Sequence, residues 1–270
     1  MTLILIALAI LPSLVIGYWI YLQDRYEKEP FNLLFKAFVV GCASTIPAML
    51  LQYQFQDLED GDSLMATAIF AFAVVGFTEE LSKFLLLRFF IYPNDEFNEP
   101  MDGIVYAVMV SMGFATVENL IYVLTNDGGI NTAIGRAFTA VPAHAAFAVL
   151  MGSYIGLAKF VPERRNYYMF IGLGLGIFFH GLYDFFLLQK VYQGLGALAI
   201  GALVWGISAS RQLIRLGQEL SPFKPRFEEN DEQIQPIVLE ETSKLEKTDE
   251  NQQSNNAPKD DLEIKNDNVI

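Results

Sequence analysis

The sequence predicts an all-α fold, a polytopic integral membrane helix bundle of about seven transmembrane helices followed by a disordered C-terminal tail. Hydrophobic residues make up 53% of the 270-residue chain and charged residues only 18%, which is typical of a membrane protein and not of a soluble enzyme with a polar surface. Seven apolar runs are each long enough to cross a hydrocarbon core of about 30 Å at about 1.5 Å per residue. The apolar runs end near residue 209, and beyond residue 225 the sequence becomes strongly charged.

Each apolar run predicts one spanning helix. The first is apolar for too long to be a signal peptide and lacks a basic segment before it, so we expect it to be retained. The third is long enough to tilt or to extend past the interface. The predicted spans lie near residues 2 to 22, 31 to 51, 63 to 92, 101 to 124, 134 to 158, 168 to 188 and 191 to 209. They define a membrane domain over 1–210 and a juxtamembrane segment over 211–225.

The tail, residues 226–270, carries 13 acidic and 5 basic residues, so it contributes −8 of the net charge of −13. It has few aromatic residues and cannot bury enough apolar area to offset the entropy of ordering, so it is predicted to be disordered. Nothing in the chain offers a basic face for phosphates, which argues against nucleic-acid binding. A single cysteine, Cys42, excludes an intrachain disulfide and a multi-cysteine metal site.

Basic residues in the connections predict the orientation through the positive-inside rule. The opposite side has only Arg136 and Lys190. The N-terminus is therefore expected outside and the C-terminus in the cytoplasm. The residues on the predicted cytoplasmic side are Arg25, Lys28, Lys36, Arg88, Lys159, Arg164, Arg165, Arg211 and Arg215.

Charged and ionisable residues inside the apolar runs are the candidates for chemistry. An acid or base at the bilayer centre costs about 2.5 to 3.5 kcal/mol, so such residues are expected to face one another or a wet cavity. Counted along each span, they fall at a similar membrane depth, near the middle or somewhat toward the outside. The residues are Glu79, Glu80, Lys83, Glu118, His144, His180 and Asp184, with Asn119 beside Glu118.

Helical spacing brings these residues together within each span. Lys83 follows Glu80 by three residues and Glu79 by four, which places the three side chains on one helix face. His180 and Asp184 are also four apart. Both histidines lie on stripes of small residues, which allow neighbouring helix backbones to approach closely. The stripes contain Gly152 and Gly156 after His144, and Gly172 and Gly176 before His180.

This set of groups suits hydrolysis. Adjacent carboxylates in a medium of low dielectric repel each other, so one of the pair Glu79 and Glu80 is suited to take a proton from water. His144 and His180 are candidates to donate to an oxyanion or to bind a metal, and Asp184 to orient His180 or assist at the oxyanion. Purely structural ion pairs and interhelical hydrogen bonds are the alternative for each of them.

A metal is one option for such a site. Glu118, His144 and His180, with Glu79 or Glu80 as base, would provide three ligands and an open position for a catalytic Zn²⁺. No His-Glu-x-x-His motif occurs in the chain, so water activated by glutamate without a metal stays open. An ion- or proton-coupled transporter that uses the same buried charges is the alternative function, and an inert scaffold for single-pass proteins is a third.

Several motifs, on separate predicted spans, resemble those of one family. They are Tyr21-Leu22-Gln23-Asp24-Arg25-Tyr26-Glu27-Lys28-Glu29-Pro30, Glu-Glu-x-x-Lys at 79–83, Glu99-Pro100-Met101-Asp102-Gly103-Ile104-Val105-Tyr106, Gly113-Phe114-Ala115-Thr116-Val117-Glu118-Asn119, His144, and His-x-x-x-Asp at 180–184. Over roughly residues 18–188 the chain resembles the PrsW family of bacterial intramembrane proteases and, more distantly, the CAAX-protease and Abi superfamily. That superfamily usually has a histidine at the position of Glu118.

The resemblance implies proteolysis in or beside a bacterial cell membrane, with Glu79, Glu80, His144, His180 and Asp184 as the catalytic set. Lys83, Glu118 and Asn119 are expected to support it. Members of the family are similar to a site-one protease that cuts a single-pass anti-sigma factor on its extracytoplasmic side, as part of a stress response. The implied partners are a single-pass membrane substrate and the lipid bilayer. The family is often described as metalloprotease, whereas related enzymes use glutamate-activated water.

Overall fold

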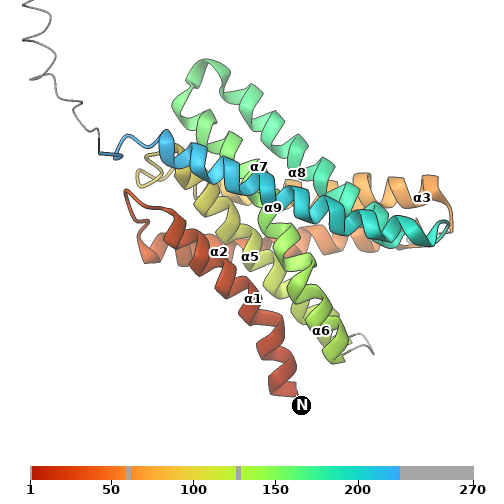
Figure 1. Ribbon diagram of the computed structural model, residues 1–270. Coiled ribbons are helices and arrows are strands. Elements are labelled where there is room, and N and C mark those ends of the chain that lie inside the picture. Colours follow the sequence, from red (N-terminus) through yellow and green to blue (C-terminus); the bar gives the residue numbers. More distant parts are fainter. Residues whose placement is uncertain (1, 59–61, 126–128, 226–270) are drawn as a thin grey trace, which may run out of the picture. The chain divides into compact units, whose positions relative to one another are not determined.

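The computed structural model describes residues 2–58, 62–125 and 129–225 and shows helices, with no β-strand in these ranges (Figure 1). Seven stretches are long and apolar enough to cross a membrane, which confirms the predicted fold class. The helices are α1 (Thr2–Gln23), α2 (Phe31–Tyr53), α3 (Leu64–Ala68), α4 (Phe77–Phe90), α5 (Pro100–Thr125), α6 (Gly129–Phe138), α7 (Ala140–Phe160), α8 (Arg165–Leu188) and α9 (Gly196–Glu219), with short 3₁₀ turns η1 (Gln56–Leu58), η3 (Pro162–Arg164) and η4 (Gln193–Leu195).

The chain divides into two units, Met1–Lys224 and Pro225–Ile270. The first unit contains all the helices named above. Helix α9 continues without interruption through the predicted domain boundary at residue 210 and ends at Glu219. The predicted disordered tail over 226–270 lies outside the described residues.

Helix α5 forms the centre of the bundle and packs against α1, α2 and α7, while α8 and α9 pack against α7. Glycine allows the close approach at these contacts. A Cβ atom added at Gly41 of α2 would lie 1.9 Å from the carbonyl oxygen of Val110 on α5, and one added at Gly152 of α7 would lie 2.3 Å from that of Gly103. The predicted small-residue stripe of α7 therefore faces the central helix, as expected for helices that pack backbone to backbone.

We expect Gly41→Ala to destabilise the bundle by about 3 kcal/mol, because the added methyl group overlaps the α5 backbone and the two helices must separate. The measurement is thermal unfolding of the purified protein in detergent. Gly201→Ala on α9 is the matched control, since a Cβ there meets nothing within 4 Å and the gain in helix propensity is the same. Equal melting temperatures for the two variants would contradict this packing.

The third and fifth spans are less regular than predicted. Between α3 and α4 the chain forms a π-helix, η2 (Ile69–Gly76), which ends with the N–H of Phe77 bonded to the carbonyl of Phe72. Such wide turns often occur at functional sites, and this one leads directly into Glu79 and Glu80. The fifth span is interrupted at Thr139, where α6 ends and α7 begins.

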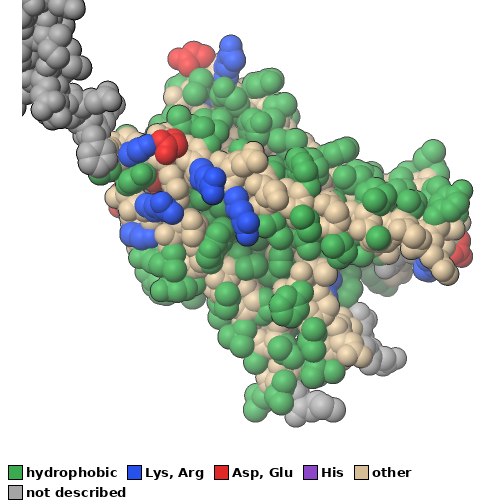
Figure 2. Space-filling view, viewed as in Figure 1, with side chains coloured by type: hydrophobic (Ala, Val, Ile, Leu, Met, Phe, Trp, Pro, Cys, Tyr) green, Lys and Arg blue, Asp and Glu red, His purple; other side chains and the backbone are tan. Residues whose placement is uncertain are grey.

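The connections lie at two ends of the bundle. At one end Lys36 donates to the carbonyl of Phe90 and Lys159 to those of Tyr92 and Asn94, so the connections predicted to be cytoplasmic lie together. Figure 2 shows Lys and Arg side chains near the end of α9, while hydrophobic side chains cover most of the face in view. An apolar surface of this kind suits contact with lipid. Which end is cytoplasmic stays a prediction.

Candidate active site

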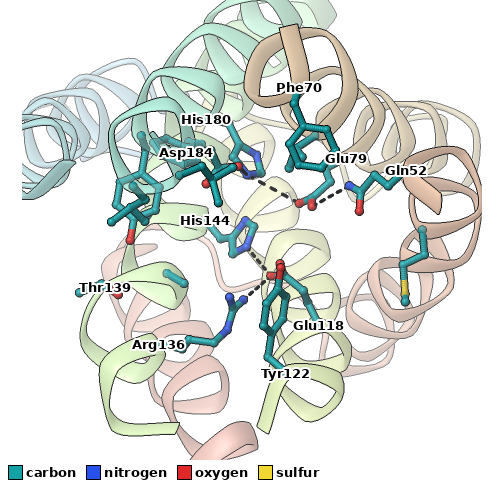
Figure 3. Close-up of a pocket in the computed structure, with 18 of the residues that line it drawn as sticks. Gln52, Phe70, Glu79, Glu118, Tyr122, Arg136, Thr139, His144, His180 and Asp184 are labelled. Carbon is teal, nitrogen blue, oxygen red and sulfur yellow. Dashed lines mark hydrogen bonds and ion pairs between the residues drawn. The ribbon is translucent and has the colours of Figure 1, made fainter. Parts of the chain in front are cut away.

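A cavity of about 400 Å³ lies among α2, the π-helix and helices α4 to α8 (Figure 3). It is close to the ends of α2 and α8, away from the connections rich in Lys and Arg. Polar side chains from six elements point into it. They are Gln52, Glu79, Glu118, Arg136, His144, His180 and Asp184, with Phe70, Tyr122 and Phe147 among the apolar members.

Glu79 and Glu80 lie in the first turn of α4 and both are buried, but their surroundings differ. Glu79 lines the cavity, whereas Glu80 is covered and packs near Gly176 of α8. Lys83 lies one turn later, with its Nζ 2.8 Å from Glu80 Oε1 and 3.4 Å from Glu79 Oε2. The predicted three- and four-residue spacing therefore produces one buried cluster, and the tertiary structure distinguishes its two acids.

His180 of α8 lies between three carboxylates. Its Nδ1 is 2.8 Å from Glu80 Oε1, so Glu80 fixes the orientation of the ring. Its Nε2 faces the cavity, 3.3 Å from Asp184 Oδ2 and 3.7 Å from Glu79 Oε2. Phe147 stacks on the ring at 5.3 Å between centroids. Asp184 is thus placed beside the histidine nitrogen that faces the cavity.

His144 of α7 is held by two charged partners. The Lys83 ammonium lies 3.2 Å from Nδ1, and because an ammonium only donates, Nδ1 accepts this hydrogen bond. The proton of the neutral ring is then on Nε2, which donates to Glu118 Oε2 at 2.8 Å. The neighbours of His144 therefore select one tautomer of the neutral ring.

Arg136 of α6 completes the wall of the cavity and was not among the predicted site residues. Its Nη2 donates to Glu118 Oε2 and its Nε to Asn119 Oδ1, each at 2.6 Å. The guanidinium also lies 4.0 Å from the centre of the Tyr122 ring. In the sequence Arg136 stands out only as one of the two basic residues on the side predicted to be outside.

Gln52 of α2 was also missed by the sequence interpretation. Its Nε2 donates to Glu79 Oε1 at 3.0 Å and lies 3.4 Å from Thr78 Oγ1. A glutamine near the end of an apolar helix gives no local signal of function. Its role depends on the approach of α2 to α4, which only the packing determines.

Glu79, His144 and His180 each offer one ligand atom within 4.8 Å of the others, so this set fits a metal ion. The predicted ligands were Glu118, His144 and His180, so the two sets share both histidines. Glu118 accepts a hydrogen bond from Nε2 of His144. Carboxylates on the far ring nitrogens, Glu80 for His180 and Glu118 for His144, are typical of metal-binding histidines.

The charge of the cluster also fits a divalent cation. Four acids, Glu79, Glu80, Glu118 and Asp184, face two cations, Lys83 and Arg136, which leaves two negative charges when both histidines are neutral. Lys83 donates to Nδ1 of His144. Its ammonium would have to move for that histidine to become a ligand through Nδ1.

Comparisons with known proteins point to one family. Residues 29–209 match the model of the PrsW family intramembrane metalloprotease. The chain is 41% identical over 200 residues to "Protease PrsW" of Geobacillus kaustophilus, which covers 73% of this chain and 87% of the relative. It is 32% identical over 216 residues to "Protease PrsW" of Clostridioides difficile (78% and 91%) and 34% identical over 184 residues to that of Bacillus subtilis (68% and 82%). No solved structure gives a significant match.

Proposed function

Because the chain belongs to the PrsW family of intramembrane metalloproteases, it is a membrane-embedded hydrolase, and we propose that it cleaves single-pass membrane proteins with a water activated by Glu79. Membership of a protease family favours this function over the transporter and the scaffold. The observation that carries the proposal is the position of Glu79, whose carboxylate lines the cavity while Glu80 is covered.

Glu79 is oriented from both sides. Gln52 donates to its Oε1 and Lys83 to its Oε2, so the carboxylate is held against the cavity wall. A carboxylate in this position takes a proton from a water in the cavity as the water attacks a peptide carbonyl. Glu80 has a positioning role, because it binds Lys83 and His180 and keeps both in place.

His180 stabilises the charge that forms during the attack. With Nδ1 fixed by Glu80, a ring that carries a proton on Nε2 donates to the oxyanion of the tetrahedral intermediate or to the leaving amine. Asp184, 3.3 Å from that nitrogen, stabilises the protonated ring. His144 is kept at the wall of the cavity by Glu118, Arg136 and Lys83.

A metal ion would be held by Glu79, His144 and His180, with Asp184 beside them. In that form Glu79 and His180 would act as ligands instead of as base and oxyanion donor. When bound, an ion such as Zn²⁺ supplies Lewis-acid activation of water and carbonyl groups. The donor types suit Zn²⁺, since nitrogen and carboxylate ligands are common in its catalytic sites.

The proposed substrate is a single-pass regulator, such as an anti-sigma factor, cut in a site-one cleavage. The cavity lies near the ends of α2 and α8, on the side that the positive-inside rule makes extracytoplasmic. A peptide bond just outside the substrate's membrane helix would reach Glu79 from that side. The resemblance to a site-one protease supports the same substrate class.

The test is cleavage of candidate single-pass substrates by purified protein in liposomes, with and without a chelator. We expect cleavage on the extracytoplasmic side of the substrate helix. Loss of activity in chelator and recovery with Zn²⁺ would show that the metal-bound form is the active one. Activity that persists in chelator would favour glutamate-activated water without a metal. No cleavage of any single-pass substrate by folded protein would contradict the proposal.

Gln52→Leu is expected to lower kcat by about 10-fold, because removal of a hydrogen bond to a charged group costs about 1.5 to 3 kcal/mol and leaves Glu79 less firmly oriented. The measurement is the rate of substrate cleavage in the same liposomes. Gln54→Leu, exposed two residues later, is the matched control and should keep the wild-type rate. A wild-type rate for Gln52→Leu would show that this contact does not position Glu79.

A further inference from the structure

A second group of acids lies at the other end of the bundle, in motifs that the hydrolytic site does not use. Asp24, Glu27 and Glu29 belong to the connection between α1 and α2, and Glu99 and Asp102 to the start of α5. Four of them are buried, with exposed fractions of 0% for Asp24 and Asp102, 1% for Glu99 and 2% for Glu29. Carboxylate oxygens of Glu27, Glu29 and Asp102 lie within 4.8 Å of one another.

Some oxygens of this acidic cluster have protein donors. Tyr106 donates to Glu29 Oε2 and Ser221 to Glu99 Oε2. Asp102 Oδ2 accepts the backbone N–H groups of Asn98 at 2.6 Å and Glu99 at 2.7 Å, just before α5 begins, as the acid of a capping box does. One oxygen of each of Glu29, Glu99 and Asp102 is therefore held by a protein donor, which also fixes the direction of the second oxygen.

The opposite oxygens are buried without a hydrogen-bond partner among the described residues. They are Asp24 Oδ1 and Oδ2, Glu27 Oε2, Glu29 Oε1 and Asp102 Oδ1, together with the side-chain oxygen of Asn98. Buried carboxylate oxygens are costly when left unpaired. A positive charge bound among these oxygens would offset the cost of burying them together.

The nearby lysines donate to backbone carbonyls and form no ion pair with these carboxylates in the described part of the chain. Lys28 Nζ donates to the backbone carbonyls of Tyr21 and Asp24, and Lys159 Nζ to those of Tyr92 and Asn94. Burial together with the neighbouring Glu99 and Asp102 raises the pKa of Asp24 to about 7. Burial and Asp102 raise the pKa of Glu29 to about 10. Both pKa values are raised first by burial and then by the neighbouring acids.

We propose that this acidic cluster binds a hard divalent cation, Ca²⁺ or Mg²⁺, that joins the α1–α2 connection to the start of α5. All the available donor atoms are oxygens, and carboxylate and amide oxygens are the ligands that these two ions prefer. The cluster contains no histidine or cysteine, so it differs in chemistry from the site at Glu79. Ser221, which follows α9 and binds Glu99, connects that helix to the same place.

The test uses full-length protein in detergent, stripped with EDTA, with thermal unfolding followed as CaCl₂ or MgCl₂ is added. Saturation is expected to raise the Tm by about 5 °C, and the ion with the lower half-saturating concentration is the one the site prefers. Glu29→Gln and Asp102→Asn, which keep their hydrogen-bond acceptors, should lose the shift. Glu96→Gln, at an exposed position in the connection between α4 and α5, and Glu79→Gln should keep it.

Absence of a shift for the wild type in both salts, or a full shift in Glu29→Gln, would overturn the proposal. Shared protons would then neutralise the cluster. In that case the folded protein binds protons that the unfolded chain has released, so the Tm of the stripped protein falls as pH rises from about 4 to about 7.

A second measurement keeps the proposal testable if the variants fail to fold. Tb³⁺ is a stand-in for Ca²⁺ whose luminescence is sensitised by a nearby tyrosine, and Tyr106 contacts Glu29 directly. Excitation of tyrosine in the stripped Glu79→Gln protein, which lacks a ligand of the other candidate metal site, should give a saturable Tb³⁺ signal of one site per chain, displaced by excess CaCl₂. No saturable signal, or one that CaCl₂ leaves unchanged, would contradict a site for this class of ion.

Discussion

Glu79→Gln is expected to lower the rate of peptide-bond cleavage by about 1,000-fold or more, because an amide cannot take the proton of the attacking water. The variant keeps the size of the side chain and the acceptor for Gln52, so the protein should remain folded. The measurement is single-turnover cleavage of a single-pass substrate in liposomes, with the Tm recorded in parallel. Glu163→Gln, exposed at the other end of the bundle, is the control for loss of an acid.

The variant Glu80→Gln distinguishes the role of Glu80 from that of Glu79. It removes the charge that pairs with Lys83 and His180, so we expect it to lower both the Tm and the activity, whereas Glu79→Gln lowers activity at a nearly unchanged Tm. The reverse pattern, with a stable inactive Glu80→Gln and an active Glu79→Gln, would assign the proton transfer to Glu80. Wild-type activity in both variants would exclude the pair as the base.

Lys83→Met is expected to destabilise the protein by about 3 to 5 kcal/mol, because removal of one partner leaves buried carboxylates without their cation. The ammonium has three partners, Glu79, Glu80 and His144, and is 1% exposed. Thermal unfolding in detergent measures the loss. Lys36→Met, which removes an exposed lysine bonded to a backbone carbonyl, should change the Tm little.

The double variant Lys83→Met with Glu80→Gln tests the reason for that loss. If the uncompensated charge of Glu80 causes the destabilisation, its neutralisation should restore part of the Tm but none of the activity. A double variant that is less stable than either single variant by the sum of their effects would instead show that the two side chains contribute independently.

Much of this protein follows from local sequence. An apolar run of about 20 residues has one stable way to satisfy its backbone in lipid, so each run predicts a helix. The seven spans are confirmed. Because a helix repeats every 3.6 residues, the spacing of Glu79, Glu80 and Lys83 also predicts their common face, and the structure shows their contacts.

Local sequence does not identify residues whose role depends on contact with a neighbouring helix. Arg136 contacts Glu118 because α6 packs against α5, and Gln52 contacts Glu79 because α2 packs against α4. The π-helix before Glu79 also has no clear pattern in its apolar sequence. Each of these features depends on contacts between segments that are distant in the chain.

The sequence by itself therefore determined the helices, the acids and histidines that had to avoid lipid, and the family motifs. Only the tertiary structure decided which carboxylate lines the cavity, which groups hold the histidines, and that acids of the α1–α2 connection lie beside those at the start of α5. The physical reason is that helix formation and burial cost are local properties, whereas distances between side chains on different helices depend on how closely their backbones pack.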